Sequence, residues 1–208
     1  DAMALKRSDI GVSMGITGTD VAKGTADMVL MDDNFATIVS AVEEGRIIYS
    51  NIRKFVFFLL SCNVGEILIV FLSILLQLPV PLLPIQLLWL NLVTDSFPAL
   101  ALGTEKGDPD IMQLKPRSAK EPILNNVMLT GIAVQSMALT LAVLLAFTWA
   151  LREYSGDVLK ARTIAFTTLI LAELIRAYSS RSERFSIIKL GIFTNRTLVL
   201  ASIVSFLL

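Results

Sequence analysis

Residues 55–78 read FVFFLLSCNVGEILIVFLSILLQL, and Glu66 is the only charged residue among them. A transmembrane helix needs about 20 mostly apolar residues, so this stretch is long enough to cross a bilayer. A carboxylate near the middle of such a helix costs roughly 2.5–3.5 kcal/mol on insertion scales. The stretch therefore predicts a membrane helix in which Glu66 is paired, protonated or bound to a cation.

The composition of the whole chain is also typical of a membrane protein. Hydrophobic residues make up 54% of it, and its mean hydropathy is +0.70, which is rare for a soluble domain. The formal net charge is zero, which excludes a generally basic nucleic-acid-binding protein. We therefore expect a lipid bilayer, and no nucleic acid, as a partner.

The available ligand types restrict any metal site. The chain has no histidine and a single cysteine, Cys62, which excludes a zinc or copper site built from nitrogen and sulfur ligands. Any bound metal is therefore expected to be a hard cation held by oxygen atoms. We interpret Cys62 as a small buried hydrophobic residue, and one cysteine cannot form a disulfide within the chain.

The apolar run is predicted to continue a longer helix. Residues 35–78 contain no proline, and their first half is amphipathic whereas the second half is almost wholly apolar. We expect one helix about 65 Å long, at 1.5 Å per residue. Because a bilayer core is only about 30 Å thick, this helix is predicted to start in water and end in lipid, and to carry motion between the two.

Residues 1–34 have a different pattern. Residues 10–14 and 28–31 are predicted to form short strands, and residues 20–26 a helix with Thr19 as its N-cap. Strand, helix and strand in this order indicate the end of a parallel α/β domain. The segment is too short to hold a core of its own.

Four further stretches are predicted to cross the membrane. Prolines 79, 81 and 84 end the long helix and force a turn, and Pro98 is expected to break the span that follows. The positive-inside rule places the N-terminal part and the basic loops 103–122 and 179–196 in the cytoplasm. The four stretches are residues 85–102, 123–151, 162–178 and 198–208, the last cut off by the end of the chain. The predicted fold is mainly α, a multi-helix transmembrane bundle with a short α/β remnant at the N-terminus.

Polar side chains share faces of the first two predicted spans. Asn63 and Glu66 are three residues apart, and Gly65 between them permits a neighbouring helix to approach closely. In the next span, Asn91, Thr94 and Asp95 follow an i, i+3, i+4 pattern. Both faces are therefore suited to meet inside a bundle.

Pro98 adds an oxygen to this set. It cannot donate to the carbonyl of Thr94, which is freed at the level of Asp95. Irregular backbone at membrane depth is tolerated where it lines a cavity or an ion path.

Glu173 supplies a third carboxylate, and the set then offers only oxygen ligands to a cation. Calcium takes 6–8 oxygens at about 2.3–2.6 Å, and three acids favour a divalent ion, or two ions, over a single potassium. Two alternatives remain open at this point. Asn63, Asn91 and Thr94 are also suited to plain interhelical hydrogen bonds, and Arg176, three residues after Glu173, is placed to neutralise it.

Two blocks of sequence resemble membrane helices five and six of P-type cation ATPases. Residues 61–66 read SCNVGE and residues 86–95 read QLLWLNLVTD, which is most similar to calcium pumps of the sarcoplasmic-reticulum type. Residues 116–122, PRSAKEP, resemble the cytoplasmic loop after helix six, and residues 1–6, DAMALK, resemble the end of the hinge motif. Because the chain opens in mid-motif, we expect it to be a C-terminal piece of a longer protein.

The resemblance implies a domain organisation. Residues 1–34 would be the end of the phosphorylation domain, with a haloacid-dehalogenase-like fold, residues 35–54 the cytoplasmic stalk helix, and residues 55–208 membrane helices five to eight and part of nine. The phosphorylated Asp, the actuator and nucleotide domains, and helices one to four and ten would lie in the rest of the polypeptide. The intact protein is then expected to export calcium with ATP and magnesium, and the piece alone to be inactive.

The resemblance also implies roles for individual residues. Asp1 and Lys6 would belong to the hinge motif, with Asp1 near the magnesium and phosphate. Asn91 and Asp95 would serve a second calcium site, completed by helix four. The first calcium site would be formed by Asn63, Glu66, Thr94, Asp95 and Glu173.

Two positions depart from the family pattern. Met3 stands where proline is usual, and Arg176 stands where the reticulum pumps carry Asn, so a fixed positive charge near the site leaves the number of ions per cycle open. The alternatives are a pump for manganese, sodium and potassium, or protons, and a non-enzymatic channel or regulatory module. Glu66 argues against the secretory-pathway manganese and calcium subgroup, which lacks an acid there. Short loops favour a bacterial plasma membrane.

Overall fold

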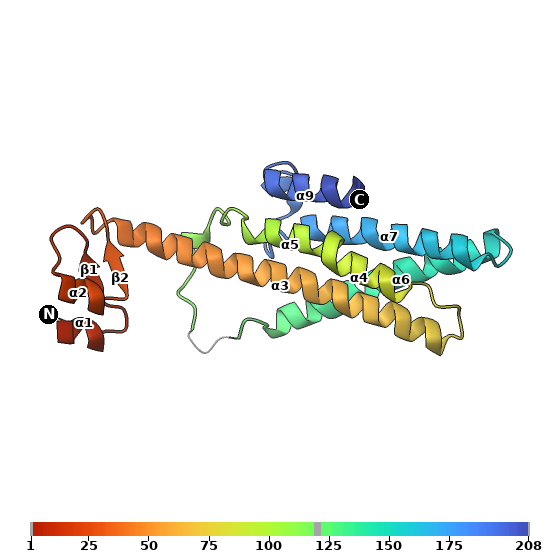
Figure 1. The fold of residues 1–208 in the computed structure, drawn as a ribbon, viewed down its shortest axis with the longest axis horizontal. Coiled ribbons are helices and arrows are strands. Elements are labelled where there is room, and N and C mark those ends of the chain that lie inside the picture. The colour runs from red at the N-terminus through yellow and green to blue at the C-terminus, as the bar shows by residue number, and fades with distance from the viewer. Residues whose placement is uncertain (1, 119–121, 208) are drawn as a thin grey trace. The chain divides into compact units, whose positions relative to one another are not determined.

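The computed structural model describes residues 2–118 and 122–207 (Figure 1). They divide into two compact units, one up to Ile47 and one from Ile48 onward. The structure is mainly helical, as predicted, and strands occur only in the first unit of the described chain.

The first unit contains the predicted strand–helix–strand segment. Strands β1 and β2 pair in parallel, with Val12 opposite Met28. The hydroxyl of Thr19 accepts a hydrogen bond from the backbone N–H of Ala22 at 3.3 Å, which confirms the predicted N-cap. Both strands are shorter than predicted. The elements are α1 (Ala2–Arg7), β1 (Val12–Met14), α2 (Asp20–Thr25) and β2 (Met28–Leu30).

Asp33 ties the turn after β2 to the turn after β1. Its carboxylate accepts hydrogen bonds from the backbone N–H groups of Ile16 and Thr17, both at 2.8 Å. These bonds, that from Ile16 foremost, lower the pKa of Asp33, so the carboxylate stays ionised. The parallel pair is therefore closed by a charged side chain at one end.

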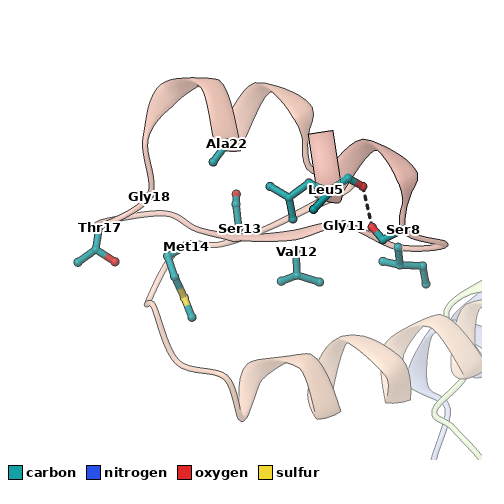
Figure 2. Close-up of a pocket in the computed structure, with 11 residues that line it drawn as sticks. Leu5, Ser8, Gly11, Val12, Ser13, Met14, Thr17, Gly18 and Ala22 are labelled. Carbon is teal, nitrogen blue, oxygen red and sulfur yellow. Dashed lines mark hydrogen bonds between the residues drawn. The ribbon is translucent and has the colours of Figure 1, made fainter. Parts of the chain in front are cut away.

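The first unit leaves apolar surface uncovered. A cavity of about 510 Å³ is lined by residues that include Leu5, Val12, Met14 and Ala22 (Figure 2). The side chain of Met31, which directly follows β2, is 78% exposed. The segment does not bury a core of its own, because two short strands and two six-residue helices have too little apolar area to enclose one.

Helix α3 (Thr37–Leu75) is the predicted long helix, slightly shorter than the expected 35–78. It ends in a Schellman motif, in which the N–H of Leu78 bonds the carbonyl of Ser73 and the N–H of Gln77 bonds that of Ile74. Gln77 takes the left-handed conformation, with φ 55°. The helix therefore stops before Pro79, by its own capping bonds.

The cap of α3 predicts a stabilising substitution. Glycine adopts the left-handed conformation without the steric cost that a side chain carries, so Gln77→Gly is expected to stabilise the folded protein by roughly 0.5–1 kcal/mol. The measurement is the thermal unfolding midpoint of the full-length protein in detergent. Gln77→Ala, which keeps the steric cost, is the control, and a lower midpoint for the glycine variant would contradict the assignment.

The second predicted span contains an irregular turn, but not at Pro98. Helix α4 (Pro84–Trp89) widens into the π-helical turn η1 (Leu90–Asp95) and continues as α5 (Ser96–Gly103), with Pro98 inside the last segment. The hydroxyl of Ser96 bonds the carbonyl of Asn91 at 2.9 Å within this wide turn. A proline ring clashes with the preceding turn of a helix, and the extra width upstream accommodates it. The break is thus one turn earlier than predicted, at the polar residues.

The remaining helices pack against one another. Helix α6 (Asn126–Glu153) packs against α7 (Val158–Ser179), and α5 packs against α9 (Arg196–Leu207). The elements are the 3₁₀ turn η2 (Ile111–Gln113), α6 (Asn126–Glu153), α7 (Val158–Ser179), α8 (Ile187–Leu190) and α9 (Arg196–Leu207).

Gly65 permits the close approach that its position predicted. A methyl group at Gly65 would lie 2.5 Å from the side chain of Leu139 in α6. The hydroxyl of Ser136 in α6 donates to the backbone carbonyl of Ser61 at 2.8 Å. Small residues and side-chain hydrogen bonds thus hold α3 to α6, as is usual between membrane helices.

Three helical stretches within the described residues are long and apolar enough to span a membrane: Thr37–Leu75, Pro84–Gly103 and Asn126–Glu153. Helix α7, predicted as a further span, forms but is not among them. Its sequence includes Lys160, Arg162, Glu173 and Arg176, which lower its hydropathy. Helix α9 has only 12 described residues, too few to cross a bilayer.

Candidate cation site

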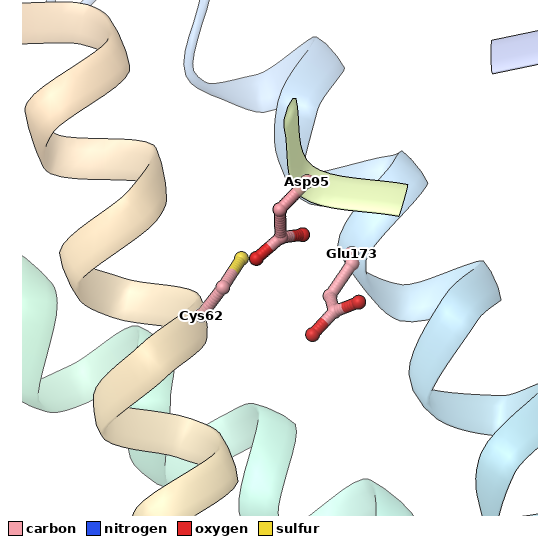
Figure 3. A group of neighbouring side chains, drawn as sticks. All are labelled: Cys62, Asp95 and Glu173. Atoms are coloured by element: carbon pink, nitrogen blue, oxygen red, sulfur yellow. The ribbon is translucent and has the colours of Figure 1, made fainter. Parts of the chain in front are cut away.

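Three side chains from separate elements meet inside the second unit. Cys62 comes from α3, Asp95 from the π-helical turn η1 and Glu173 from α7 (Figure 3). The sulfur of Cys62 and one carboxylate oxygen of each acid all lie within 4.8 Å of one another. All three side chains have 0% exposure. We call Cys62, Asp95 and Glu173 the buried triad.

The carboxylates of the buried triad have no hydrogen-bond partners among the described residues. This holds for both oxygens of Asp95 and both oxygens of Glu173. Burying an ionised carboxylate without a partner costs several kcal/mol, and two carboxylates this close repel each other when both are ionised. The arrangement therefore requires protons or an added positive charge.

Glu66 and Asn91 make a separate contact between α3 and η1. The amide nitrogen of Asn91 donates to Oε2 of Glu66 at 2.8 Å and to the carbonyl of Leu87 at 2.9 Å. Oε1 of Glu66 is buried and has no hydrogen bond within the described chain. Glu66 thus borders the buried triad without belonging to it.

The other two predicted ligands differ in their surroundings. The hydroxyl of Thr94 is buried and has no hydrogen-bond partner in the described chain. The amide of Asn63 donates to the carbonyl of Leu59 within its own helix, at 2.8 Å. Plain interhelical hydrogen bonding therefore accounts for Asn91, which bonds Glu66, but for neither of these two.

Arg176 does not neutralise Glu173. Its Nη2 donates to the hydroxyl of Ser61 at 2.6 Å, and its guanidinium lies 5.4 Å from the centre of the Phe57 ring. Glu173, one turn earlier in α7, keeps both oxygens unpaired within the described chain. The alternative in which Arg176 pairs with Glu173 is therefore not what the structure shows.

Cys62 is more than the apolar residue that its sequence context predicted. It is fully buried, as expected, but its sulfur borders two carboxylates. A signal for this was present in the sequence, because Cys62 precedes Glu66 by four residues and so lies on the same helix face. A single cysteine cannot build a thiolate site alone, but it can complete a site of oxygens.

Of the two predicted hinge residues, Asp1 lies outside the described residues. Lys6 is exposed in the last turn of α1, in the first unit.

A second buried polar cluster, which sequence reasoning missed, lies beyond the end of α5. Arg181 donates to both oxygens of Glu105, at 2.8 and 2.9 Å, and Asn195 donates to the same carboxylate at 2.7 Å. Burial alone would raise the pKa of Glu105, but the hydrogen bonds from Arg181 and Asn195 outweigh it and lower the pKa. Glu105 and Arg181 are 76 residues apart, so no local pattern indicates the pair.

The same cluster holds α3 to the chain after α5. The amide of Asn51 donates to the backbone carbonyl of Glu105 at 2.7 Å, and Lys54 lies 3.7 Å from the carboxylate of Asp108. Asn51, Lys54, Glu105 and Asp108 are all buried. We call Asn51, Lys54, Glu105, Asp108, Arg181 and Asn195 the loop cluster.

Comparison with known proteins decides the family. The family described as "Cation transporting ATPase, C-terminus" matches residues 79–208. The chain belongs to this family. Its resemblance to P-type cation ATPases is thereby confirmed, and this family together with the three long apolar helices of the described residues supports a multi-pass integral membrane protein.

Several relatives of this chain have curated names. "Calcium-transporting ATPase" of Bacillus subtilis is 49% identical over 208 residues, which cover 100% of the chain and 23% of the relative. "Calcium-transporting ATPase 1" of Bacillus cereus is 47% identical over 223 residues, which cover 100% of the chain and 25% of the relative. "Calcium-transporting ATPase type 2C member 1" of Homo sapiens is 42% identical over 213 residues, covering 100% of the chain and 23% of the relative. The chain thus spans about a quarter of the length of these relatives.

Proposed function

We propose that this chain is the C-terminal transport part of an ATP-driven calcium exporter. The observation that carries the proposal is the set of buried, unpaired oxygens of Glu66, Asp95 and Glu173. They come from α3, η1 and α7, and their negative charge suits a divalent cation that sheds its water for protein oxygens. The names of the relatives support calcium as that ion.

The ligands divide between two places in this proposal. Asp95 and Glu173 form the centre, and Thr94 adds a buried hydroxyl with a free lone pair. Glu66 and Asn91 form a neighbouring pair. Asn63 would become a ligand once its amide breaks the hydrogen bond to the carbonyl of Leu59. The widened turn η1 presents three of the proposed ligands: Asn91, Thr94 and Asp95.

Residues 1–34, which lie within the first unit, are proposed to be the end of the phosphorylation domain. The parallel strands of this segment fit the edge of a larger α/β domain, and its uncovered apolar surface suits burial against the rest of that domain. Asp1 and Lys6 would then lie near the magnesium and phosphate of the full protein. The proposed stalk, residues 35–54, belongs to α3 from Thr37 onward, and this helix continues to Leu75 and would carry motion into the membrane.

The orientation and the missing parts complete the proposal. The N-terminal part and the loops 103–122 and 179–196 would face the cytoplasm of a bacterium, where ATP and magnesium are bound by the nucleotide and phosphorylation domains. The actuator domain and helices one to four and ten would come from the remaining polypeptide. Two of the named relatives are bacterial, which supports a bacterial plasma membrane.

Glu66→Gln tests the proposal in the full-length protein. The amide oxygen of glutamine still accepts the hydrogen bond from Asn91, so only the charge is lost. Calcium-dependent phosphorylation by ATP is expected to need at least about 100-fold more calcium, because removing one partner of a buried charge pair costs roughly 3–5 kcal/mol.

Glu44→Gln is the matched control, since Glu44 is an exposed acid on the same helix. It is expected to leave the calcium dependence unchanged. Repeating the assay with manganese, sodium, potassium and protons in place of calcium separates the other pumps of the family. A Glu66→Gln protein that is phosphorylated at the ordinary calcium concentration would refute the ligand assignment.

A further inference from the structure

We propose that Cys62 makes the cation site of this chain a mixed sulfur and oxygen site that binds thiophilic divalent cations such as Cd²⁺ at the place proposed for calcium. Only the statement that this is also the calcium site rests on the proposed function. The inference names a residue that selects among ions, and it follows from the buried triad.

The geometry of the buried triad fits a single ion. Two ligands on opposite sides of an ion at about 2.3–2.6 Å stand about 4.6–5.2 Å apart. The sulfur of Cys62 and the oxygens of Asp95 and Glu173 lie within 4.8 Å of one another, so one ion can contact all three. Figure 3 shows the three side chains converging from their separate elements.

The two acids supply independent support for a ligand at this place. Asp95 and Glu173 have 0% exposure, and all four of their oxygens lack hydrogen bonds within the described chain. An ion bound between them and the sulfur satisfies all three side chains at once.

The sulfur ligand determines which cations the site binds more tightly. Thiolate ligands prefer soft cations, whereas calcium prefers hard oxygen ligands. Coordination by a soft divalent ion displaces the thiol proton, forming a sulfur–metal bond and releasing one H⁺ to water. Calcium would be held by the oxygens, with the thiol as a neutral neighbour. Cys62 therefore adds affinity for Cd²⁺ while contributing little to calcium.

Arg176 limits the charge that the site can accept. Its guanidinium donates to Ser61, the residue before Cys62. Two carboxylates, one thiolate and this nearby cation leave a net charge of about −2, which one divalent ion balances, while Glu66 stays with Asn91 in the neighbouring pair. The site is therefore suited to one soft divalent ion.

The test measures displacement of radioactive calcium by Cd²⁺ from the full-length protein in detergent, for wild type and Cys62→Ser. Serine matches cysteine in shape and replaces the soft ligand by a hard one. Half-displacement by Cd²⁺ is expected to need at least about 10-fold more cadmium in the variant, after correction for the calcium affinity measured for each protein. Equal cadmium concentrations for both proteins would overturn the proposal.

Ultraviolet absorption by the thiolate–cadmium bond is the second measurement, and it does not depend on transport. Titrating wild-type protein with Cd²⁺ is expected to produce this band, Cys62→Ser to lose it, and Asp95→Asn to require more cadmium for it. A band that survives Cys62→Ser, or that is indifferent to Asp95→Asn, refutes the mixed site. If wild-type protein binds no calcium but shows the Cys62-dependent band, the proposed function fails and the cadmium site stands.

Discussion

Asp95→Asn is expected to lower the apparent calcium affinity of the full-length protein by at least about 100-fold, the largest effect of any single ligand. Asp95 lies in the buried triad, and neither of its carboxylate oxygens has a hydrogen bond within the described chain to compensate for a lost ion. Removing one partner from a buried charge pair costs roughly 3–5 kcal/mol, which corresponds to about 100-fold to a few thousand-fold in a binding constant.

The same substitution is expected to stabilise the protein when calcium is absent. An amide at position 95 removes one of two adjacent buried carboxylates and with it their repulsion. The measurements are calcium binding at equilibrium and the thermal unfolding midpoint in chelator. Glu153→Gln, an exposed acid at the end of α6, is the control for both. A variant that binds calcium normally and unfolds at a lower temperature would contradict the site.

Arg181→Met is expected to destabilise the protein by roughly 3–5 kcal/mol, because it leaves the buried carboxylate of Glu105 without its main partner. Arg181 has 2% exposure and also donates to the carbonyl of Gly191 at 2.7 Å and to the hydroxyl of Thr194 at 2.6 Å. Its loss therefore removes hydrogen bonds to two other chain segments, at Glu105 and at residues 191–194. The measurement is the thermal or chemical unfolding of the full-length protein in detergent.

A double-mutant cycle separates the ion pair from the loss of packing. Glu105→Gln with Arg181→Met is expected to cost less than the sum of the two single changes, because no unpaired buried charge remains. Arg152→Met, which removes an exposed arginine from the last turn of α6, is expected to change stability by no more than about 0.5 kcal/mol. Additive effects in the cycle, or an Arg181→Met protein as stable as wild type, would show that the pair is not coupled.

Local sequence patterns predicted most of the helices. The long helix through Glu66, the helix that follows residue 123 and the helix that carries Glu173 all formed, because apolar runs without proline leave the backbone little alternative in a membrane. The two parallel strands also formed, within the short stretches 10–14 and 28–31 that were predicted for them. Errors arose at ends and irregular turns. Gln77 ends α3 by a capping motif that glycine usually makes, and η1 precedes Pro98 by a turn.

The candidate site divides in the same way. The sequence by itself determined that Glu66, Asp95 and Glu173 would lie in apolar surroundings, since each is embedded in a hydrophobic run and cannot leave it without unfolding the helix. Only the tertiary structure decided that Asp95 and Glu173 share their space with Cys62, that Glu66 bonds Asn91, and that Arg176 turns to Ser61. Helical periodicity states which residues share a face. Which faces meet depends on how α3, η1 and α7 pack, and that is set by contacts such as Gly65 against Leu139 that join residues far apart in the chain.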